Sequence, residues 1–410
     1  MQRVILHSDM NNFYASVECL YHPEIRGKPV IVCGDPELRH GIVLAKNYLA
    51  KSAGVITGEP IWQARSKCPG LVPIKANFAL YLRFAHAARA IYADYTDQVE
   101  PFGLDEAWLD VTGSASRGSG EAIADEIRQR IYRELGITVS IGVSFNKIFA
   151  KLGSDLKKPD AITVITPENF RSKIWPLPAK DLLYIGPSTW GKLRRISLNT
   201  IGKVAGADPA FLRSYLGKWG DVLWTFANGL DDSPVARTGD YADIKSVGHS
   251  TTTPRDLTTE TDVRMTVYIL AEAVAARLRE LGFLCRTVQI SVRDKEMTSF
   301  ERQHRLSEPT CLASVLTQSA MELFRSNYDW SLAIRSVGVR AADLVSASDC
   351  RQLSLWTKSN HRQEKLERTV EDLRRRYGHF AIQRGLMLQD AHLSDLAPKE
   401  DHVIFPVSYF

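Results

Sequence analysis

The sequence predicts an α+β multidomain protein on the basis of three observations. The chain has 410 residues, which is more than one ordinary hydrophobic core usually organises. Strand-like and helical patterns alternate up to residue 166, whereas residues 167–233 contain only short helical patterns broken by glycine. Residues 245–348 then follow the order β-α-β-β-α-β, which is typical of a separate α+β domain.

The composition narrows the class of protein. Apolar residues make up 44% and charged residues 24% of the chain, as in soluble globular proteins. The net charge of +5 fits a polyanionic partner without identifying one. The six cysteines are scattered with no C-x-x-C pair, which argues against a zinc site. Because there is no signal-peptide core and no apolar run of about eighteen residues, we expect a cytoplasmic protein with no membrane partner.

Three carboxylates occupy defined places in the expected elements. Residues 3–8 predict a short buried strand, and NNFYASVECLYH predicts a helix that Asn11 or Asn12 could cap, so Asp9 falls at a strand-to-helix junction. The stretch QVEPFGLDEAWLDVTG alternates around Asp105 and Glu106 and predicts a β-hairpin. Further predicted elements are strands over 28–34, 41–48 and 137–145 and helices over 77–96, 119–136 and 146–159.

Three carboxylates suit the metal-dependent joining of phosphates. Joining phosphates requires two divalent ions about 4 Å apart, one to activate the attacking hydroxyl and one to hold the leaving oxygens. Mg²⁺ selects carboxylate oxygens and leaves positions for water and phosphate. An Asp-Glu pair at a turn is also common as a solvated surface, so the pair by itself does not establish a metal site.

Four motifs give the carboxylates a context. They are HSDMNNFYASVE, LAKNYLAKSAGV, PFGLDEAWLDVTG and GVSFNKIFAKLGSDLKKP. In this order and spacing they resemble the Y-family (translesion) DNA polymerases, most closely the bacterial DNA polymerase IV branch, and the resemblance runs from residue 3 to about 356. It implies a right-hand polymerase with an α/β palm, small fingers, an all-helical thumb and a β-α-β-β-α-β little finger. The implied domains are the palm (1–10 and 75–166), fingers (11–74), thumb (167–233), linker (234–244), little finger (245–348) and tail (349–410).

The resemblance assigns roles at the catalytic centre. Asp9, Asp105 and Glu106 are implied to be catalytic and to hold two Mg²⁺ ions, with Mn²⁺ as an alternative, and the carbonyl of Met10 is implied as a further ligand. Tyr14 is implied to be a steric gate, because its ring would occupy the space that a ribose 2′-hydroxyl needs.

Other residues are implied to bind the incoming nucleotide. Phe13 would pack beside it, although ordinary packing of the helix face is the alternative for Phe13 and also for the gate residue. Tyr48, Lys51 and Lys158 are implied to face the phosphates. Lys51 departs from the family, which usually has Arg there, and an ammonium cannot grip two oxygens as a guanidinium does; Lys46 is a candidate to share its load. Gly103 replaces the usual Ser, and we expect it to loosen the turn.

Two regions are candidates for contact with DNA. Residues 182–205 resemble a helix-hairpin-helix, in which Gly186 and Lys192 would approach a DNA phosphate, and a Gly-broken helical pair without a ligand is the alternative. In the little finger, basic side chains on the predicted strands are candidate phosphate contacts. These are Arg293, Lys295, Arg302, His304, Arg305, Arg335 and Arg340.

The tail contains a peptide with leucine and an aromatic residue at set spacing, which a hydrophobic groove can capture. It consists of Gln352, Leu353, Ser354, Leu355 and Trp356 and resembles the peptide with which bacterial polymerases bind the sliding clamp. The alternative is that its apolar side chains fold back onto the little finger.

The expected function is low-fidelity DNA synthesis across damaged templates, as translesion synthesis. The expected partners are primer-template DNA, a dNTP and the sliding clamp, for a monomeric, nucleoid-associated enzyme. The fingers of about 64 residues offer little bulk to close over the nascent base pair. A catalytically silent DNA- and clamp-binding adaptor is the alternative, and a cyclase built on a similar palm is a second one.

Overall fold

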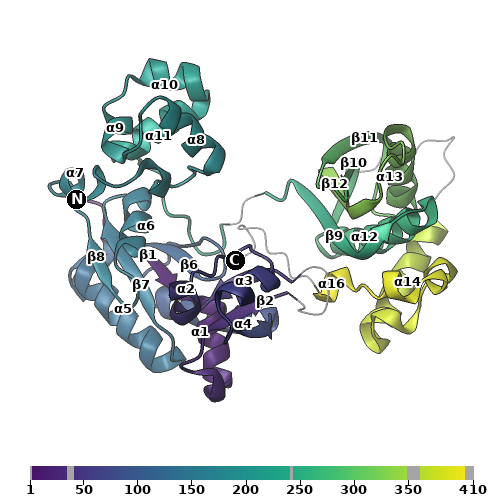
Figure 1. The fold of residues 1–410 in the computed structure, drawn as a ribbon, viewed down its shortest axis with the longest axis horizontal. Helices are drawn as coiled ribbons and strands as arrows, with labels where there is room; N and C mark the ends of the chain where they lie inside the picture. Colours follow the sequence, from purple (N-terminus) through teal and green to yellow (C-terminus); the bar gives the residue numbers. More distant parts are fainter. Residues whose placement is uncertain (1, 35–40, 241–242, 349–360, 402–410) are drawn as a thin grey trace. The chain divides into compact units, whose positions relative to one another are not determined.

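The computed structural model describes residues 2–34, 41–240, 243–348 and 361–401. The chain divides into two compact units between residues 241 and 242, and each unit is described by itself (Figure 1). None of the helices in the described residues combines the length and the apolar character that a membrane crossing requires.

A five-stranded sheet with the order β5-β6-β1-β7-β8 forms the centre of the first unit. Its strands are β1 (Ile5–Met10), β5 (Val99–Pro101), β6 (Glu106–Asp110), β7 (Val139–Ser144) and β8 (Ile162–Val164). One face packs against α1 (Phe13–Tyr21), α4 (Phe78–Ala93) and α5 (Gly120–Leu135), and the other face against α6 (Lys147–Leu156). The expected strands, hairpin and helices of this part are confirmed, and β8 is an addition.

The alternation along β1 assigns its side chains to the two faces of the sheet. Leu6 and Met10 lie in the apolar core with α4 and α5, whereas Ile5 and His7 face α6. Helix α6 approaches β7 so closely that a Cβ at Gly142 would lie 1.9 Å from the carbonyl oxygen of Ala150. Glycine at this position therefore allows α6 to cover the polar face of the sheet.

Residues 30–75 form a smaller sheet with the order β3-β2-β4 and a core of its own. Its elements are β2 (Val30–Cys33), β3 (Val43–Lys46), β4 (Val72–Lys75), α2 (Tyr48–Ser52) and α3 (Ile61–Lys67). Strand β4, which is parallel to β2, was not expected from the sequence. Helix α1 falls within the predicted fingers, yet its buried Phe13 and Val17 belong to the core of the larger sheet. Asn12 is the N-cap residue of α1, as one of the two predicted candidates, but its side chain makes no capping bond.

Residues 167–230 contain helices and no strand, as the sequence predicts. They are α7 (Phe170–Ile174), α8 (Pro187–Arg195), α9 (Ile201–Ala205), α10 (Pro209–Leu216) and α11 (Lys218–Ala227). The following segment was predicted as a linker, but its first part is bound to the first unit. Val235 is 2% exposed and packs with Ile5 and Trp108, and the amide of Ala236 donates to Glu100 Oε2 at 2.9 Å. The linker is therefore shorter than 234–244.

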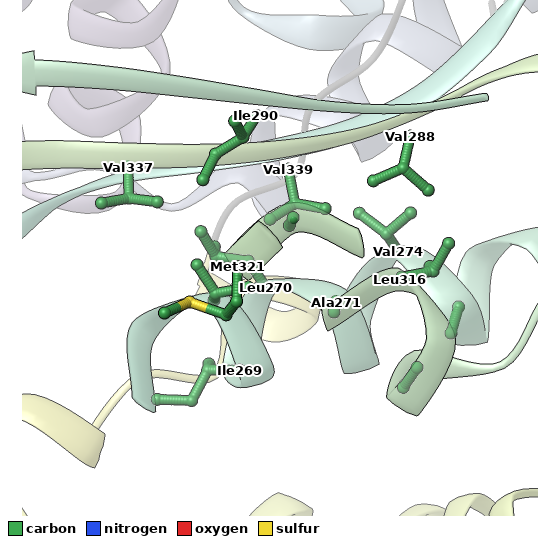
Figure 2. Close-up of a cluster of buried hydrophobic side chains, with 14 of the residues drawn as sticks. Ile269, Leu270, Ala271, Val274, Val288, Ile290, Leu316, Met321, Val337 and Val339 are labelled. Atoms are coloured by element: carbon green, nitrogen blue, oxygen red, sulfur yellow. The ribbon is translucent and has the colours of Figure 1, made fainter. Parts of the chain in front are cut away.

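The second unit has the expected β-α-β-β-α-β order. Its sheet has the order β11-β10-β12-β9, and helices α12 and α13 cover one face. The elements are β9 (Ser246–Leu257), α12 (Glu260–Glu280), β10 (Phe283–Asp294), β11 (Ser299–Thr310), α13 (Ala313–Asn327) and β12 (Ile334–Ser346). Figure 2 shows Val288, Ile290, Val337 and Val339 of the sheet pointing toward Leu270 and the other apolar side chains of the two helices.

The part of the tail that the structure describes packs on α12. It contains α14 (His361–Tyr377), α15 (Ala391–Ser394) and α16 (Pro398–Asp401). Arg279 of α12 pairs with Glu367 at 3.1 Å and Glu371 at 2.9 Å, and Met387 and Leu393 enter the apolar core. Residues 361–401 therefore extend the core of the second unit.

We expect Gly142→Ala to lower the free energy of unfolding by about 3 kcal/mol, because the new methyl group would force α6 away from β7. Gly70→Ala is the matched control, since a Cβ at Gly70 would meet no atom within 4 Å, and it should change stability by less than about 0.5 kcal/mol. Denaturant unfolding of both variants measures the difference. Equal stabilities would contradict the close approach of α6.

Candidate active site

The three carboxylates lie at one end of the five-stranded sheet. Asp9 and Glu106 are directly opposite each other in the β1–β6 pairing. Asp105 precedes β6, and its carbonyl oxygen accepts a hydrogen bond from the amide of Met10 at 3.0 Å. Antiparallel pairing thus brings together acids that are almost a hundred positions apart in the sequence.

Two lysines hold two of these acids. Lys158 Nζ lies 2.6 Å from Asp9 Oδ2 and 2.8 Å from Asp155 Oδ1. Lys151 Nζ, from α6, donates to Glu106 Oε2. Among the described residues no three His, Cys, Asp or Glu side chains stand together in a ready-made metal site. In this structure Asp9 and Glu106 are each paired with a lysine ammonium group.

His7 is a further partner of Glu106 that the sequence reasoning missed. Its ring is fully buried, with Nδ1 at 2.8 Å from Ser154 Oγ and Nε2 at 3.3 Å from Glu106 Oε2. A sequence signal for it existed, because a residue two positions before Asp9 on a strand points to the same face. Lys151 had no such signal, since its reach depends on how α6 crosses the sheet.

Burial and mutual repulsion dominate the electrostatics of the acids. Burial raises the pKa of Asp9 to about 7, against the effect of Lys158 and with that of Glu106. Burial and the neighbouring Glu106 raise the pKa of Asp105 to about 6. Burial disfavours the charged form of Glu106 too, but His7 and Lys151 hold its pKa down at about 2.

This donor set fits hard divalent cations such as Mg²⁺. Carboxylate oxygens are the ligands such ions prefer. Asp9 is buried and Asp105 is half-buried, the charged forms of both are disfavoured, and a bound cation would relieve that penalty.

Tyr14 is fixed next to the acids by aromatic packing. Its ring stacks on Tyr81 with centroids 4.3 Å apart and an interplanar angle of 12°. Burial and the nearby Asp105 raise the pKa of Tyr14 to about 12. Phe13, in contrast, is 3% exposed within the core, so packing accounts for its ring.

Two of the predicted phosphate-binding residues, Tyr48 and Lys51, lie on α2, and the third, Lys158, follows α6. Lys51 is exposed, with Nζ 5.8 Å from the ring centroid of Tyr48, whereas Lys46 Nζ donates to Thr57 Oγ1 at 2.9 Å. A cavity of about 330 Å³ opens beside Tyr48 and contains none of the three acids in its lining. Its lining consists of Asn11, Asn12, Ala15, Ser16, Cys19, Asn47, Tyr48, Leu49, Thr138 and Pro159.

Two hydrogen bonds anchor the turn before Asp105, which contains Gly103. This residue has φ of +90°, which glycine adopts without strain. Its carbonyl oxygen accepts a hydrogen bond from Arg89 Nη2 at 3.0 Å, and the amide of Phe102 donates to the carbonyl of Glu106 at 2.9 Å. These two bonds close the turn, and the effect of glycine in place of serine stays a prediction.

The candidate DNA contacts of the helical segment are accessible. Gly186 is the exposed N-cap residue of α8, and no atom lies within 4 Å of the position of a Cβ there. Lys192, on the same helix, is exposed. Their contact with DNA stays a prediction.

Strand register places the candidate DNA contacts of the second unit on two different faces of its sheet. Arg302 pairs with Ile290, and His304 pairs with Val288, so both lie on the side that the helices cover. Arg302 Nε also donates to Asn327 Oδ1 of α13 at 3.1 Å. Both side chains are exposed, and their contact with DNA stays a prediction.

Three other basic residues share the open face of that sheet. They are Arg293, Arg305 and Arg340, whose partners on neighbouring strands point away from the core. Arg335 lies at an irregularity of the β12 pairings, and Lys295 lies in the exposed turn after β10. DNA contact by these residues stays a prediction. The proposed clamp-binding peptide, 352–356, lies outside the described residues.

Comparisons with known proteins agree with this architecture. Residues 8–155 match the impB/mucB/samB family, and residues 244–355 match the C-terminal domain of that family. The DNA polymerase IV of Acetivibrio thermocellus is 55% identical over 397 residues, which are 96% of this chain and 100% of that protein. The DNA polymerase IV of Moorella thermoacetica is 39% identical over 389 residues, 94% of this chain and 96% of that protein.

A solved structure of a Y-family DNA polymerase chimera has the same fold. It superposes with a TM-score of 0.74 at 22% sequence identity and covers 84% of this chain and 99% of its own. The fold and the matched sequences define a DNA-directed DNA polymerase. The chain belongs to the Y family of DNA polymerases, in the branch of the DNA polymerase IV proteins.

We expect Asp9→Asn to raise the free energy of unfolding of the metal-free protein at pH 8 by roughly 1–3 kcal/mol. The folded-state pKa of Asp9 is about 7, above the unfolded value of 3.8, so the stability that its proton provides is lost as the pH rises through this interval. The gain should vanish near pH 4. Denaturant unfolding at several pH values measures it.

The matched control for Asp9→Asn is Asp155→Asn, which removes the other, exposed partner of Lys158. It should show no gain that grows with pH. Mg²⁺ should stabilise the wild type more than Asp9→Asn. A loss of stability in Asp9→Asn at pH 8 would contradict the electrostatic account.

Proposed function

We propose that the chain transfers a deoxynucleotide from a dNTP to a primer 3′-hydroxyl with two Mg²⁺ ions bound at Asp9, Asp105 and Glu106. The observation that carries the proposal is the convergence of these buried and half-buried acids at one end of the sheet, two of them with raised pKa values. When bound, the ions would supply activation of the hydroxyl and stabilisation of charge on the phosphates. Mn²⁺ is an alternative ion.

The residues around the acids have distinct proposed roles. Lys158 would exchange its contact with Asp9 for a phosphate oxygen when a nucleotide enters, because both anions compete for one ammonium group. Tyr48 and Lys51 would bind the outer phosphates, and the main chain of Met10 would supply a further ligand. Tyr14 would close the site at the sugar.

We further propose that the enzyme acts in translesion synthesis, with low fidelity. The relatives named DNA polymerase IV and the small sheet of residues 30–75 support this proposal, because so small an element offers little surface to enclose the nascent base pair. Primer-template DNA is the proposed partner, and the open face of the second sheet, with Arg293, Arg305 and Arg340, would contact its backbone. We also propose that residues 352–356 bind the sliding clamp and that the protein is monomeric.

We expect Asp105→Asn to lower the rate of primer extension with Mg²⁺ and dNTPs by at least about a thousandfold, since the substitution removes an anionic ligand at the reacting atoms. Single-nucleotide extension on undamaged and damaged templates measures the rate. Asp110→Asn is the control, because Asp110 lies at the far end of β6, and it should keep the wild-type rate. Wild-type protein that extends neither template would favour the catalytically silent adaptor.

We expect Tyr14→Ala to increase the ratio of ribonucleotide to deoxynucleotide incorporation at least tenfold, because the removed ring would leave room for a 2′-hydroxyl. Tyr21→Ala on the same helix is the control, since Tyr21 is 52% exposed and distant from Tyr14 by two helical turns. The two incorporation efficiencies are compared on one template. An unchanged ratio in Tyr14→Ala would show that Tyr14 is not a steric gate.

A further inference from the structure

Asn11 follows the catalytic strand directly, and its side chain is 2% exposed. It joins three segments of the first unit. Its Oδ1 accepts hydrogen bonds from the amide of Asp160 at 2.9 Å and from Thr138 Oγ1 at 3.0 Å, and its Nδ2 donates to Ser140 Oγ at 3.0 Å. Because a backbone amide only donates, the bond from Asp160 fixes which end of the Asn11 side chain faces the loop.

The loop that Asn11 holds carries Lys158. Asp160 lies two residues beyond this lysine and has φ of +51°, a left-handed conformation that needs support from its surroundings. The half-buried Arg128 binds the side chain of Asp160 at 2.9 Å, and the buried Asn11 binds its main chain. The path from Asp9 through Lys158 and Asp160 to Asn11 thus returns to the end of the strand on which it began, since Asn11 directly follows Met10.

We infer that Asn11 is a positioning residue for Lys158 and thereby sets the affinity for the incoming nucleotide. This inference rests on the proposed role of Lys158 at the phosphates. The required property of Asn11 is its acceptor atom, because its bonds to the loop and to Thr138 are both received by Oδ1. The amide group itself is dispensable, since Ser140 Oγ can donate in place of accepting.

This requirement separates two substitutions at the same position. Asn11→Ser keeps a polar group but is too short to reach Asp160, whereas Asn11→Asp keeps the acceptor at the same distance. We expect Asn11→Ser to raise the KM for dNTP about tenfold, with kcat changed less than about threefold. Asn11→Asp should restore a KM within about threefold of the wild-type value. Ser144→Ala removes another buried palm hydroxyl, which bonds to the carbonyl of Ile165, and should leave KM unchanged.

A double-mutant cycle tests whether Asn11 acts through the lysine. In a Lys158→Gln background, Asn11→Ser should change the KM for dNTP less than about twofold, because the group it positions is absent. A full tenfold effect in that background would overturn the inference while leaving the proposed function intact.

Hydrogen exchange gives a readout that does not depend on catalysis. The amide of Asp160 should exchange at least about tenfold faster in Asn11→Ser than in the wild type, and at the wild-type rate in Asn11→Asp and Ser144→Ala. Unchanged exchange in Asn11→Ser would overturn the inference even if the enzyme extends primers normally. Faster exchange with an unchanged KM would overturn its nucleotide-binding part. A wild type that extends no primer would instead refute the proposed function, and the exchange would still test the link to the loop.

Discussion

Burial of like charges at one end of the palm sheet is the constraint on which the rest of the first unit depends. Asp9 and Glu106 face each other across β1 and β6, and Asp105 directly precedes Glu106. Such a cluster is costly in a low-dielectric environment unless cations balance it. The chain supplies Lys151 and Lys158 for this purpose, and a divalent metal would supply more charge in the same place. Stability and catalysis thus make opposite demands on these acids.

Helix α6 and the loop after it supply the lysines that balance these charges. The helix lies on the polar face of the sheet, and Gly142 permits its close approach. From this position its Lys151 and Ser154 reach Glu106 and His7, and the loop that follows it carries Lys158 back to Asp9. Asn11 ties that loop to the end of β1. The proposed metal ligands, the lysines that balance their charge and the support of the loop are therefore parts of one packed layer.

The second unit shows how register controls which surface a residue serves. Alternation in β10 and β12 directs Ile290 and Val339 into the core and Arg293 and Arg340 to the open face. The edge strand β11 is mostly polar on both sides, so its sequence pattern does not indicate which side the helices cover. The described residues that follow the sheet belong to the same unit, because α14 and the segment after it pack on α12 through ion pairs and apolar contacts.

The sequence by itself determined the order of the elements and the identity of the acids. In β10 buried and open positions alternate, whereas β1 is buried along its whole length and is predicted from its apolar run. The motifs contain Asp9, Asp105 and Glu106. The tertiary structure decided the rest. The contact of Lys151 with Glu106 and the hydrogen bond from Asp160 to Asn11 depend on how α6 crosses its sheet. The face on which Arg302 lies depends on how β11 pairs with β10. Those relations join residues far apart in the chain, and no local pattern encodes them.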